Sequence, residues 1–346
     1  MGNEEAREGI SSRISVVVVN WNGIAYLGDC LQALCEQTRL PDEVIVVDNA
    51  STDGSAELVA ERFPGVRLVR SGANLGFAAG CNLGIRASGG DYVATLNPDA
   101  LPDPAWLEAL AAAMDEDDGL GACASLMLFA DRPDTIDSAG IALDLLGIAW
   151  DRLGGEPVST GLEQCEVFGA CGGAALYRRR MLEQMGGFDE DFFMYLEDVD
   201  LAWRAQAAGW RCLYVPAARV YHAHSASLGE GSSLKNYLKA RNKVWLIAKN
   251  YPWPQVARWA PLILLADAAT VVFACSQGNW AALRGRVRAV GGLPAALRKR
   301  PYAGLGQTQW AAVVRRMHGP ALPWGIWHRF AHLNGRGTRW PRGKVP

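Results

Sequence analysis

The chain has 346 residues, half of them hydrophobic and one fifth charged, and its formal net charge is −2. These proportions exclude a disordered or collagen-like chain, and the length is sufficient for one large domain with a smaller second region. The eight cysteines form no CxxC pair, which argues against a zinc or redox motif, and the N-terminus MGNEEAREGISSR shows neither a secretory signal nor a myristoylation site. We therefore expect a cytoplasmic protein with reduced thiols and a disordered segment at 1–12.

Strands and helices are predicted to alternate over the first hundred residues. The β-branched run at 14–19 is typical of a strand that is buried on both faces. Three more apolar runs and three stretches with helical spacing follow. The predicted strands are 43–47, 66–69 and 92–96, and the predicted helices are 26–37, 55–62 and 77–87. This alternation predicts a mostly parallel sheet with helices on both faces, whose ligand lies beyond the carboxyl ends of the strands.

A polar turn follows each of these four strands. The polar residues and glycines of these turns include Asn20, Asn22, Asp48, Asn74, Gly76, Asn97 and Asp99. Asn, Asp and Gly are ordinary turn and capping residues, so one such turn is weak evidence for a site. Four turns on one sheet edge, each with a carboxylate or a carboxamide, indicate that a ligand binds there.

The middle of the chain contains a glycine-rich run and then an acidic, aromatic segment. The run at 169–174, which includes Gly172 and Gly173, suits either a backbone close to a ligand or a tight strand in a core. The segment GGFDEDFFMYLEDVDLAWRAQAAGW at 186–210 places six carboxylates among aromatic rings. Such burial favours a raised pKa or a bound metal, whereas a solvated helix start is the simpler interpretation. Strands are predicted at 211–215 and 219–221, directly before His222 and His224.

The last third of the chain is basic. Residues 1–234 hold 35 of the 36 acids and 15 of the 34 Lys and Arg, whereas 235–346 hold 19 Lys and Arg and a single acid, Asp267. A basic helix is predicted at 233–251, with Arg241-Asn242 within it. Apolar stretches between Arg and Trp suit a lipid headgroup interface, and no nucleic-acid motif is present, so we expect a membrane surface as the partner.

The longest apolar stretch of this basic region is 260–275, and Asp267 interrupts it. It is too short to span a bilayer comfortably, which predicts a helix that lies in the interface or packs on the body of the protein. Packing against a second copy of the chain, as a homo-oligomer, is the alternative role for the basic region.

Six segments, taken in order, resemble the family 2 inverting glycosyltransferases of the GT-A fold, and most of all their bacterial rhamnosyltransferase-like subgroup. The segments are VVVVNWNG, VIVVDNASTDGS, NLGFAAGCNLG, LNPDA, GGFDEDFFMYLEDVDLAWR and VYHAHSAS. The resemblance implies a GT-A (Rossmann-like) α/β domain at 13–235, with a mostly parallel sheet flanked by helices. The region 236–346 then forms a C-terminal helical, basic, membrane-associating extension.

The resemblance implies a nucleotide-sugar donor across the strand ends, with a divalent metal on its diphosphate. Asp99 occupies the last position of the family's DxD metal-binding motif, but Asn97 occupies the first, so one carboxylate is missing. Mg²⁺ or Mn²⁺ would be held by Asp99, the diphosphate and a histidine, because hard cations prefer oxygen ligands and Mn²⁺ also accepts imidazole. His222 matches the family histidine better than His224 does.

The same resemblance assigns the other polar turns to the donor. Asp48 resembles the carboxylate that accepts a hydrogen bond from the nucleotide base, as the N3–H of uracil or thymine requires. Asn20 and Asn22 would line that pocket, and Asn74 would reach donor hydroxyls or phosphate. The remaining nucleotide-sugar residues in this prediction are Gly76, Asn97, Asp99, Gly172 and Gly173.

An inverting transfer needs a base, because the acceptor hydroxyl must lose its proton as it attacks the anomeric carbon. The family places this base in its ED pair, here Glu197-Asp198, with Asp198 at the matching position. Apolar neighbours would raise the pKa of this carboxyl, and a helix N-terminus would lower it. We expect Asp200 to pair with Arg204 on the same helix, and the segment GGFDEDFF to shape the acceptor side of the cleft.

The sequence therefore predicts a metal-dependent inverting glycosyltransferase of the hexosyltransferase type, attached to the inner face of the cytoplasmic membrane. It would take dTDP-rhamnose or a UDP-sugar and act on a saccharide or a polyprenyl-diphosphate-linked acceptor in cell-envelope polysaccharide synthesis. One alternative is a non-catalytic sugar-nucleotide or glycan-binding module, against which Asp99, Asp198 and His222 argue. The other is a nicotinamide-dependent oxidoreductase, against which the absence of GxGxxG after the first strand argues.

Overall fold

The structure is a computed structural model that describes residues 12–223, 232–300 and 306–320. The predicted disordered segment 1–12 therefore lies, apart from Ser12, outside the described residues. So does His224.

Four parallel strands form one half of the central sheet, and the apolar residues of the three inner strands are largely buried. β1 (Ile14–Asn20) lies between β2 (Glu43–Asp48) and β4 (Tyr92–Leu96), and β3 (Arg67–Arg70) continues the sheet beyond β2. All four predicted strands are thus confirmed within one residue at each end. Successive side chains of β1 point to opposite faces, so the strand contributes to two cores.

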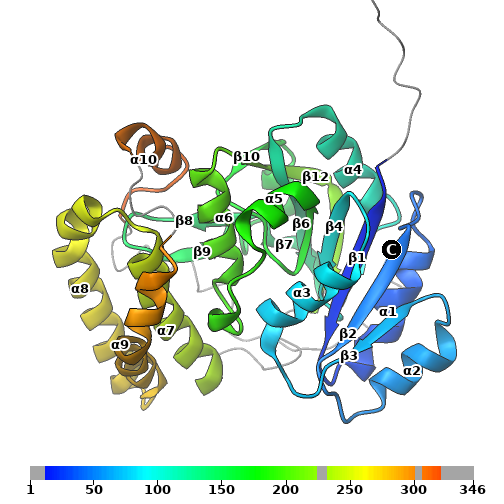
Figure 1. Cartoon of the computed structure of the whole chain (residues 1–346), viewed down its shortest axis with the longest axis horizontal. Coiled ribbons are helices and arrows are strands. Elements are labelled where there is room, and N and C mark those ends of the chain that lie inside the picture. The colour runs from blue at the N-terminus through cyan, green and yellow to red at the C-terminus, as the bar shows by residue number, and fades with distance from the viewer. Residues whose placement is uncertain (1–11, 224–231, 301–305, 321–346) are drawn as a thin grey trace, which may run out of the picture.

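Helices cover both faces of this half of the sheet (Figure 1). α1 (Ile24–Cys35), α2 (Ser55–Arg62) and α4 (Trp106–Glu116) pack on one face, and α3 (Gly76–Ala87) packs on the other. The three helices predicted from their spacing are confirmed, with boundaries shifted by two residues at most. The predicted α/β class, with a mostly parallel sheet flanked by helices, is therefore confirmed.

The other half of the sheet mixes strand directions. β11 (Ala174–Arg178) runs antiparallel between β4 and β6 (Leu120–Phe129), and β12 (Arg211–His222) is parallel to β6. The strands predicted at 211–215 and 219–221 are one strand, since β12 continues through an irregularity between Val215 and Arg219. The smaller strands are β5 (Ala100–Pro102), β7 (Arg132–Ser138), β8 (Ile141–Leu143), β9 (Ala149–Asp151) and β10 (Cys165–Val167).

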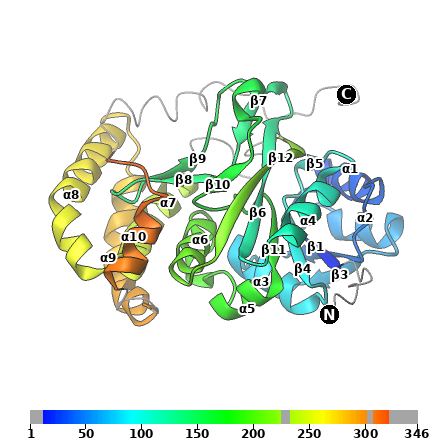
Figure 2. The same ribbon diagram turned by 90° about the horizontal axis from the view of Figure 1, so that it is seen from above.

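The C-terminal helices lie at one end of the molecule, opposite α1 and α2 (Figures 1 and 2). They are α7 (Ser233–Asn250), α8 (Trp253–Ser276), α9 (Ala281–Arg298) and α10 (Gln307–Val314). The predicted basic helix is confirmed as α7, and the apolar stretch 260–275 is part of the 24-residue α8.

A third core joins these helices to α6 (Glu197–Ala207), which follows α5 (Arg179–Met185) in the chain. The Trp203 ring of α6 stacks on Tyr251 with centroids 4.7 Å apart, and Trp310 of α10 lies 5.6 Å from the same ring. The C-terminal region is therefore packed on the body through α6. All eight cysteines are free, and four of them are buried, as expected for reduced core thiols.

Candidate active site

The turns after β1, β2 and β4 lie at the same edge of the sheet. Asn20 is opposite Asp48 in the β1–β2 register, and the backbone N–H of Asn49 donates to the Asn20 carbonyl at 2.7 Å. Asn97 follows β4, which is the neighbour of β1 on the other side. Parallel pairing thus brings residues that are up to 77 positions apart in sequence, from Asn20 to Asn97, to one edge.

The side chains of the first two turns bind one another. Asn20 is fully buried, and its Nδ2 donates to Ser55 Oγ at 2.8 Å and Ser51 Oγ at 3.1 Å. The Asn22 side chain accepts from the backbone N–H of Thr52 at 2.8 Å. Gly23 is needed beside them, because a Cβ at this position would lie 2.3 Å from Asn20 Oδ1. Asn20 and Asn22 therefore shape this edge of the sheet, whatever they bind.

Asp48 and Asn74 also bond within their own turns. Asp48 is 5% exposed, and its Oδ1 accepts from the backbone N–H of Ser51 at 3.2 Å. Asn74 Oδ1 accepts from the backbone N–H of Gly76 at 2.9 Å. Gly76 has φ +80°, and a Cβ there would lie 2.4 Å from the Phe193 carbonyl oxygen. The start of α3 therefore lies against the loop that precedes the ED pair.

A carboxylate and an imidazole lie together beside the turn after β4. The pairing of β5 with β12 puts His222 opposite Ala100, so that His222 Nε2 lies 3.3 Å from Asp99 Oδ1 and 3.4 Å from Asn97 Nδ2. The ring's other nitrogen, Nδ1, lies 2.7 Å from Oδ2 of Asp137 on β7. Burial alone would lower the pKa of His222, but Asp99 and Asp137 raise it to about 10. The imidazole is thus oriented by one carboxylate and directed at another.

These residues fit a divalent ion that also binds a diphosphate. A cluster of three or more His, Cys, Asp or Glu able to hold a metal is absent from the described ranges. Asp99 and His222 supply one hard oxygen and one nitrogen, so the ion's other ligands would have to come from the diphosphate and water. A hydrogen bond that the second ring nitrogen donates to a carboxylate, as Nδ1 of His222 does to Asp137, is the usual support of a metal-binding histidine. Sequence reasoning missed Asp137, since nothing around it in the chain marks it.

The two residues of the ED pair have different surroundings. Glu197 is 4% exposed, and its Oε2 makes no hydrogen bond within the described part of the chain. Burial, and then the charge of Asp198, raise the pKa of Glu197 well above its usual range. Asp198 is half-buried; its Oδ2 accepts from the Gly172 N–H at 3.1 Å and its Oδ1 from the Val199 N–H at 2.8 Å.

Burial raises the pKa of Asp198 to about 6 in spite of those two donors. The sequence left open whether apolar surroundings or the helix start would dominate the pKa of Asp198. The effect of burial is the larger one. The raised pKa of Glu197 favours its protonated form, and Asp198 is the more accessible carboxylate of the pair.

The glycine-rich run connects the ED pair to the turn after β4. Besides donating to Asp198, Gly172 accepts from Thr95 Oγ1 at 2.7 Å, and the Gly173 carbonyl accepts from the Asn97 N–H at 2.8 Å. A Cβ at Gly173 would lie 3.0 Å from Asn97 Nδ2. The run therefore lets two loops with ionisable groups approach each other closely.

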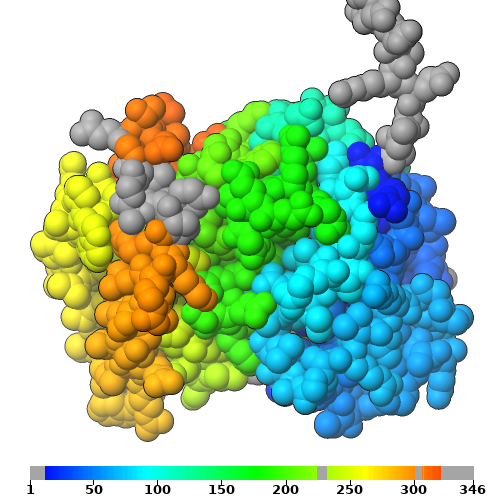
Figure 3. Space-filling model, viewed as in Figure 1, coloured from blue at the N-terminus to red at the C-terminus, as the bar shows by residue number. Residues whose placement is uncertain are grey.

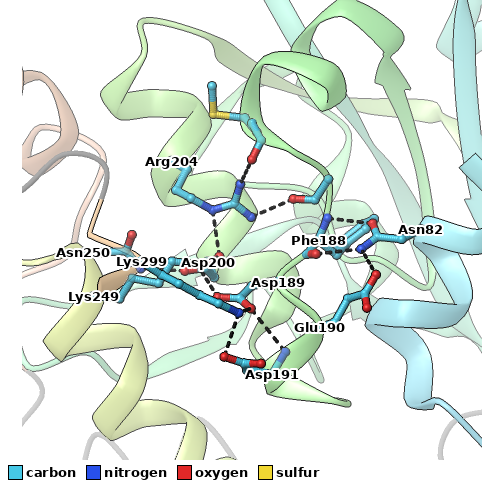
Figure 4. A network of polar contacts seen from close by, with 12 residues as sticks. Asn82, Phe188, Asp189, Glu190, Asp191, Asp200, Arg204, Lys249, Asn250 and Lys299 are labelled. Carbon is cyan, nitrogen blue, oxygen red and sulfur yellow. Dashed lines mark hydrogen bonds and ion pairs between the residues drawn. The ribbon is translucent and has the colours of Figure 1, made fainter. Parts of the chain in front are cut away.

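Asp189, Asp191 and Asp200 of the acidic segment hold the C-terminal helices (Figure 4). The predicted Asp200–Arg204 pair is confirmed at 2.8 Å, and Lys249 of α7 donates to the same carboxylate at 2.8 Å and to Asp189 at 2.6 Å. Lys299 also pairs with Asp189, and burial of that carboxyl is outweighed by the two lysines, so its pKa falls to about 2. These long-range pairs were not predicted from the sequence.

Asn82 of α3 is a structural amide at the same segment. Its Nδ2 donates to the Phe188 carbonyl at 2.8 Å and to Glu190 at 3.0 Å, and its Oδ1 accepts from the Phe188 N–H at 2.9 Å (Figure 4). The GGFDEDFF segment is thus anchored on both sides, to α3 and to the C-terminal helices.

Comparison with known proteins identifies the family. Residues 15–186 match the model named glycosyl transferase family 2. Relatives from the CDC 1551 and H37Rv strains of Mycobacterium tuberculosis, each named N-acetylglucosaminyl-diphospho-decaprenol L-rhamnosyltransferase, are 34% identical over 269 residues, which is 69% of this chain and 86% of theirs. The chain belongs to glycosyl transferase family 2. The predicted rhamnosyltransferase-like resemblance is confirmed, and the oxidoreductase alternative is wrong.

Solved structures agree on the fold of this family 2 glycosyltransferase. GalNAc-T7 with UDP, GalNAc and Mn²⁺ aligns with a TM-score of 0.56 at 16% identity, over 69% of this chain and 48% of that one. The mannosyltransferase PcManGT from Pyrobaculum calidifontis, in complex with GDP-Man and Mn²⁺, aligns with a TM-score of 0.51 at 23% identity, over 88% and 87%. The predicted GT-A fold with a C-terminal helical extension is confirmed.

Proposed function

We propose that this glycosyltransferase moves a sugar, with inversion, from a nucleotide-sugar to a polyprenyl-diphosphate-linked saccharide in cell-envelope polysaccharide synthesis. The observation that carries the proposal is Asp198, a half-buried carboxylate with a raised pKa, joined by Gly172 and Gly173 to the turn of Asn97 and Asp99. The named activity of the two mycobacterial relatives supports dTDP-rhamnose as the first donor to test, with UDP-sugars next.

The donor would bind across the edge formed by the turns after β1, β2 and β4. Asp48 would accept from the nucleotide base, beside Asn20 and Asn22, and Asn74 would face the sugar or the phosphates. The backbone at Gly76, Gly172 and Gly173 would let the donor approach closely. Asp99 and His222 would hold Mg²⁺ or Mn²⁺ on the diphosphate, with His224 as the reserve ligand, and the ion would neutralise the charge of the departing nucleotide.

Asp198 would act as the base. The acceptor hydroxyl attacks the anomeric carbon from the face opposite the nucleotide, and its proton passes to the Asp198 carboxylate as the new bond forms. A carboxyl with a pKa of about 6 is mostly ionised at neutral pH and is a stronger base than an ordinary aspartate. Glu197 would stay protonated and add no negative charge next to it.

The test replaces Asp198 with Asn. Sugar transfer by Asp198→Asn should fall by roughly two to four orders of magnitude, which is the range for a lost general base, while donor binding measured by calorimetry with Mn²⁺ stays the same. Asp191→Asn removes an exposed carboxylate from the same segment and should leave turnover near normal. Turnover that survives in Asp198→Asn would contradict the assignment and favour another base.

A membrane surface is the second partner in this proposal, and α8 with α9 would meet it. Ten of the fifteen exposed large apolar side chains of the described residues lie between Trp253 and Val290. Leu264, Leu265 and Val272 of α8 are 66–69% exposed. Figure 3 shows α8 in yellow and α9 in orange forming one side of the molecule. Such a surface, in which Asp267 is the one acid of α8 and α9 and exposed Arg284 is one of several arginines, suits anionic lipid headgroups.

α8 is long and apolar enough to cross a bilayer by length and composition alone, because the helix is longer than the apolar stretch 260–275 expected from the sequence. An orientation in the membrane plane is nevertheless the better proposal, because Asp267 in mid-helix pairs with Lys243 at 2.8 Å and Arg286 at 3.1 Å. A spanning helix would have to carry this ion cluster into the hydrocarbon or break it. The protein would therefore lie on the inner face of the cytoplasmic membrane, where its lipid-linked acceptor is found.

Vesicle flotation tests the membrane face. Leu264→Glu/Leu265→Glu should weaken binding to phosphatidylglycerol vesicles by at least about tenfold, since it places two charges on the inserted apolar surface. Leu40→Glu changes a similarly exposed leucine in the loop after α1 and should leave binding unchanged. If the double variant bound vesicles normally but dissociated a dimer in sedimentation, α8 would be a contact between subunits instead.

A further inference from the structure

The loop before the ED pair has an unfavourable backbone conformation. Phe193, Tyr195 and Leu196 have φ values of 64°, 70° and 67°, a region that side chains other than glycine rarely adopt. Leu196 immediately precedes α6, so the conformation of this loop sets where the helix begins and where Asp198 points. Strain of this kind persists only where surrounding contacts impose it.

Asn242 of α7 makes the contacts that impose it. Its side chain is fully buried, and its Nδ2 lies 3.0 Å from the Phe192 carbonyl oxygen, 2.9 Å from that of Met194 and 2.6 Å from that of Tyr195. An amide nitrogen has two hydrogens, so the three carbonyls share them. No other side chain among the described residues is shown making three hydrogen bonds to the backbone of this loop.

Arg241 fixes the direction of that amide. Its Nε donates to Asn242 Oδ1 at 2.9 Å, which leaves the amide nitrogen facing the loop, and its Nη2 donates to the Phe192 carbonyl at 2.8 Å and to the Asp191 carbonyl at 3.1 Å. On the other side of the loop, the Phe193 carbonyl accepts from the Ala78 N–H of α3 at 3.2 Å. The loop is thus held between α7 and α3.

We infer that Asn242 is a positioning residue, which holds the loop 192–196 in the strained conformation that directs Asp198 at the acceptor hydroxyl. The inference rests on the proposed function of Asp198 as the base. Asn242 would not touch a substrate. Its effect would be on the rate of transfer, because misplacing a reacting group by about 1 Å can cost on the order of a hundredfold in rate.

Release of the loop should also change the surroundings of Asp198. The ionisable groups that face it are Glu197 on α6, Asp151 on β9, Cys81 on α3, Tyr177 on β11 and Cys171. Burial keeps the two thiols and the phenol neutral around pH 6, because it raises their pKa well above the usual range. Better hydration of a freed loop would lower the pKa of Asp198 from about 6 towards its ordinary value.

The experiment measures kcat, the donor KM and the pH profile of Asn242→Ala. We expect kcat to fall by about ten- to a hundredfold with the donor KM unchanged, and the acid limb of the profile to move to lower pH. Leu238→Ala is the matched control, because it removes a buried side chain from the same helix that has no group able to hydrogen-bond to the loop. That control should lower the melting temperature and leave kcat and the acid limb unchanged.

A second variant tests the strain itself. Glycine adopts a positive φ at little cost, so Leu196→Gly in the Asn242→Ala background should restore part of the lost kcat.

Arg241→Ala serves if Asn242→Ala does not fold. It removes the hydrogen bonds to the Asp191 and Phe192 carbonyls and should lower kcat by a smaller factor. Unchanged kcat and acid limb in the folded variants would overturn the role of Asn242. Full turnover in Asp198→Asn would instead overturn the base assignment on which it rests.

Discussion

The two sides of the candidate active site are built by different means. On the sheet edge where the donor is proposed to bind (the donor edge), Asn20, Asn22 and Asp48 are held by turns that belong to neighbouring strands, and their partners lie within 35 residues of them. On the base side, the segment before and within α6 is held by α7 and by Lys299, over separations of 47 to 110 residues. The donor edge is thus a product of strand order, whereas the position of the proposed base depends on the C-terminal region.

The strongest way to break this comparison is to remove Lys249, which joins Asp189 and Asp200. Lys249→Met leaves two buried carboxylates without their shared cation, and should lower the free energy of unfolding by about 3–5 kcal/mol. Arg70→Met is the control, because it removes an exposed pair with Glu57 that is worth at most about 1 kcal/mol. Urea denaturation measures the free energy of unfolding of both variants. Equal losses would show that the buried network contributes no more to stability than an exposed ion pair.

The pH dependence of stability follows from the same network. The pKa of Asp189 is depressed to about 2 in the folded protein, so its stabilising contribution is complete above its ordinary pKa near 4 and is lost as the pH falls towards 2. Lys249→Met should reduce this acid-dependent loss, and denaturation at pH 5 and pH 3 would detect the change. An unaltered pH dependence in the variant would contradict the assigned pairing.

Asp137 is an exception within the comparison, because it supports His222 beside the donor edge from 85 residues away in the sequence. Asp137→Asn should weaken Mn²⁺ binding by about ten- to a hundredfold, which is the usual cost of losing the carboxylate behind a metal-binding histidine. Calorimetry in the presence of a nucleoside diphosphate measures the affinity. Asp134→Asn, on the same strand, is the control, and equal affinity in both variants would exclude a supporting role for Asp137.

Asp48 should give the smallest effect. Asp48→Asn keeps the shape of the turn but places an amide where the base would bind, so nucleotide affinity should fall by about tenfold, or 1.4 kcal/mol. Because the partners of Asp48 are local, the variant should leave the pH profile of transfer unchanged. A changed profile would mean that the two sides of the site are coupled through the sheet.

The sequence was sufficient to predict that the polar turns meet at one sheet edge, but not the surroundings of Asp198. Alternating apolar runs give the strands, and parallel strands bring their polar turns to one edge, so the neighbourhood of Asn20, Asp48 and Asn97 follows from local pattern. Nothing local marks Asp137 or Asn242, because each acts on a segment 47 or more residues away. The pKa of Asp198 was likewise open, since burial depends on how α6 packs.

The pH profile of transfer tests the central claim most directly. Asp198 must be ionised to accept a proton, and burial raises its pKa to about 6, so kcat/KM for the acceptor should rise through about pH 6 and level off above it. Measured at saturating donor and Mn²⁺, the acid limb should have unit slope. The pH profile of the residual activity of Asp198→Asn should lack this limb. A limb near pH 4, or a limb at pH 6 that persists in Asp198→Asn, would show that another group is the base.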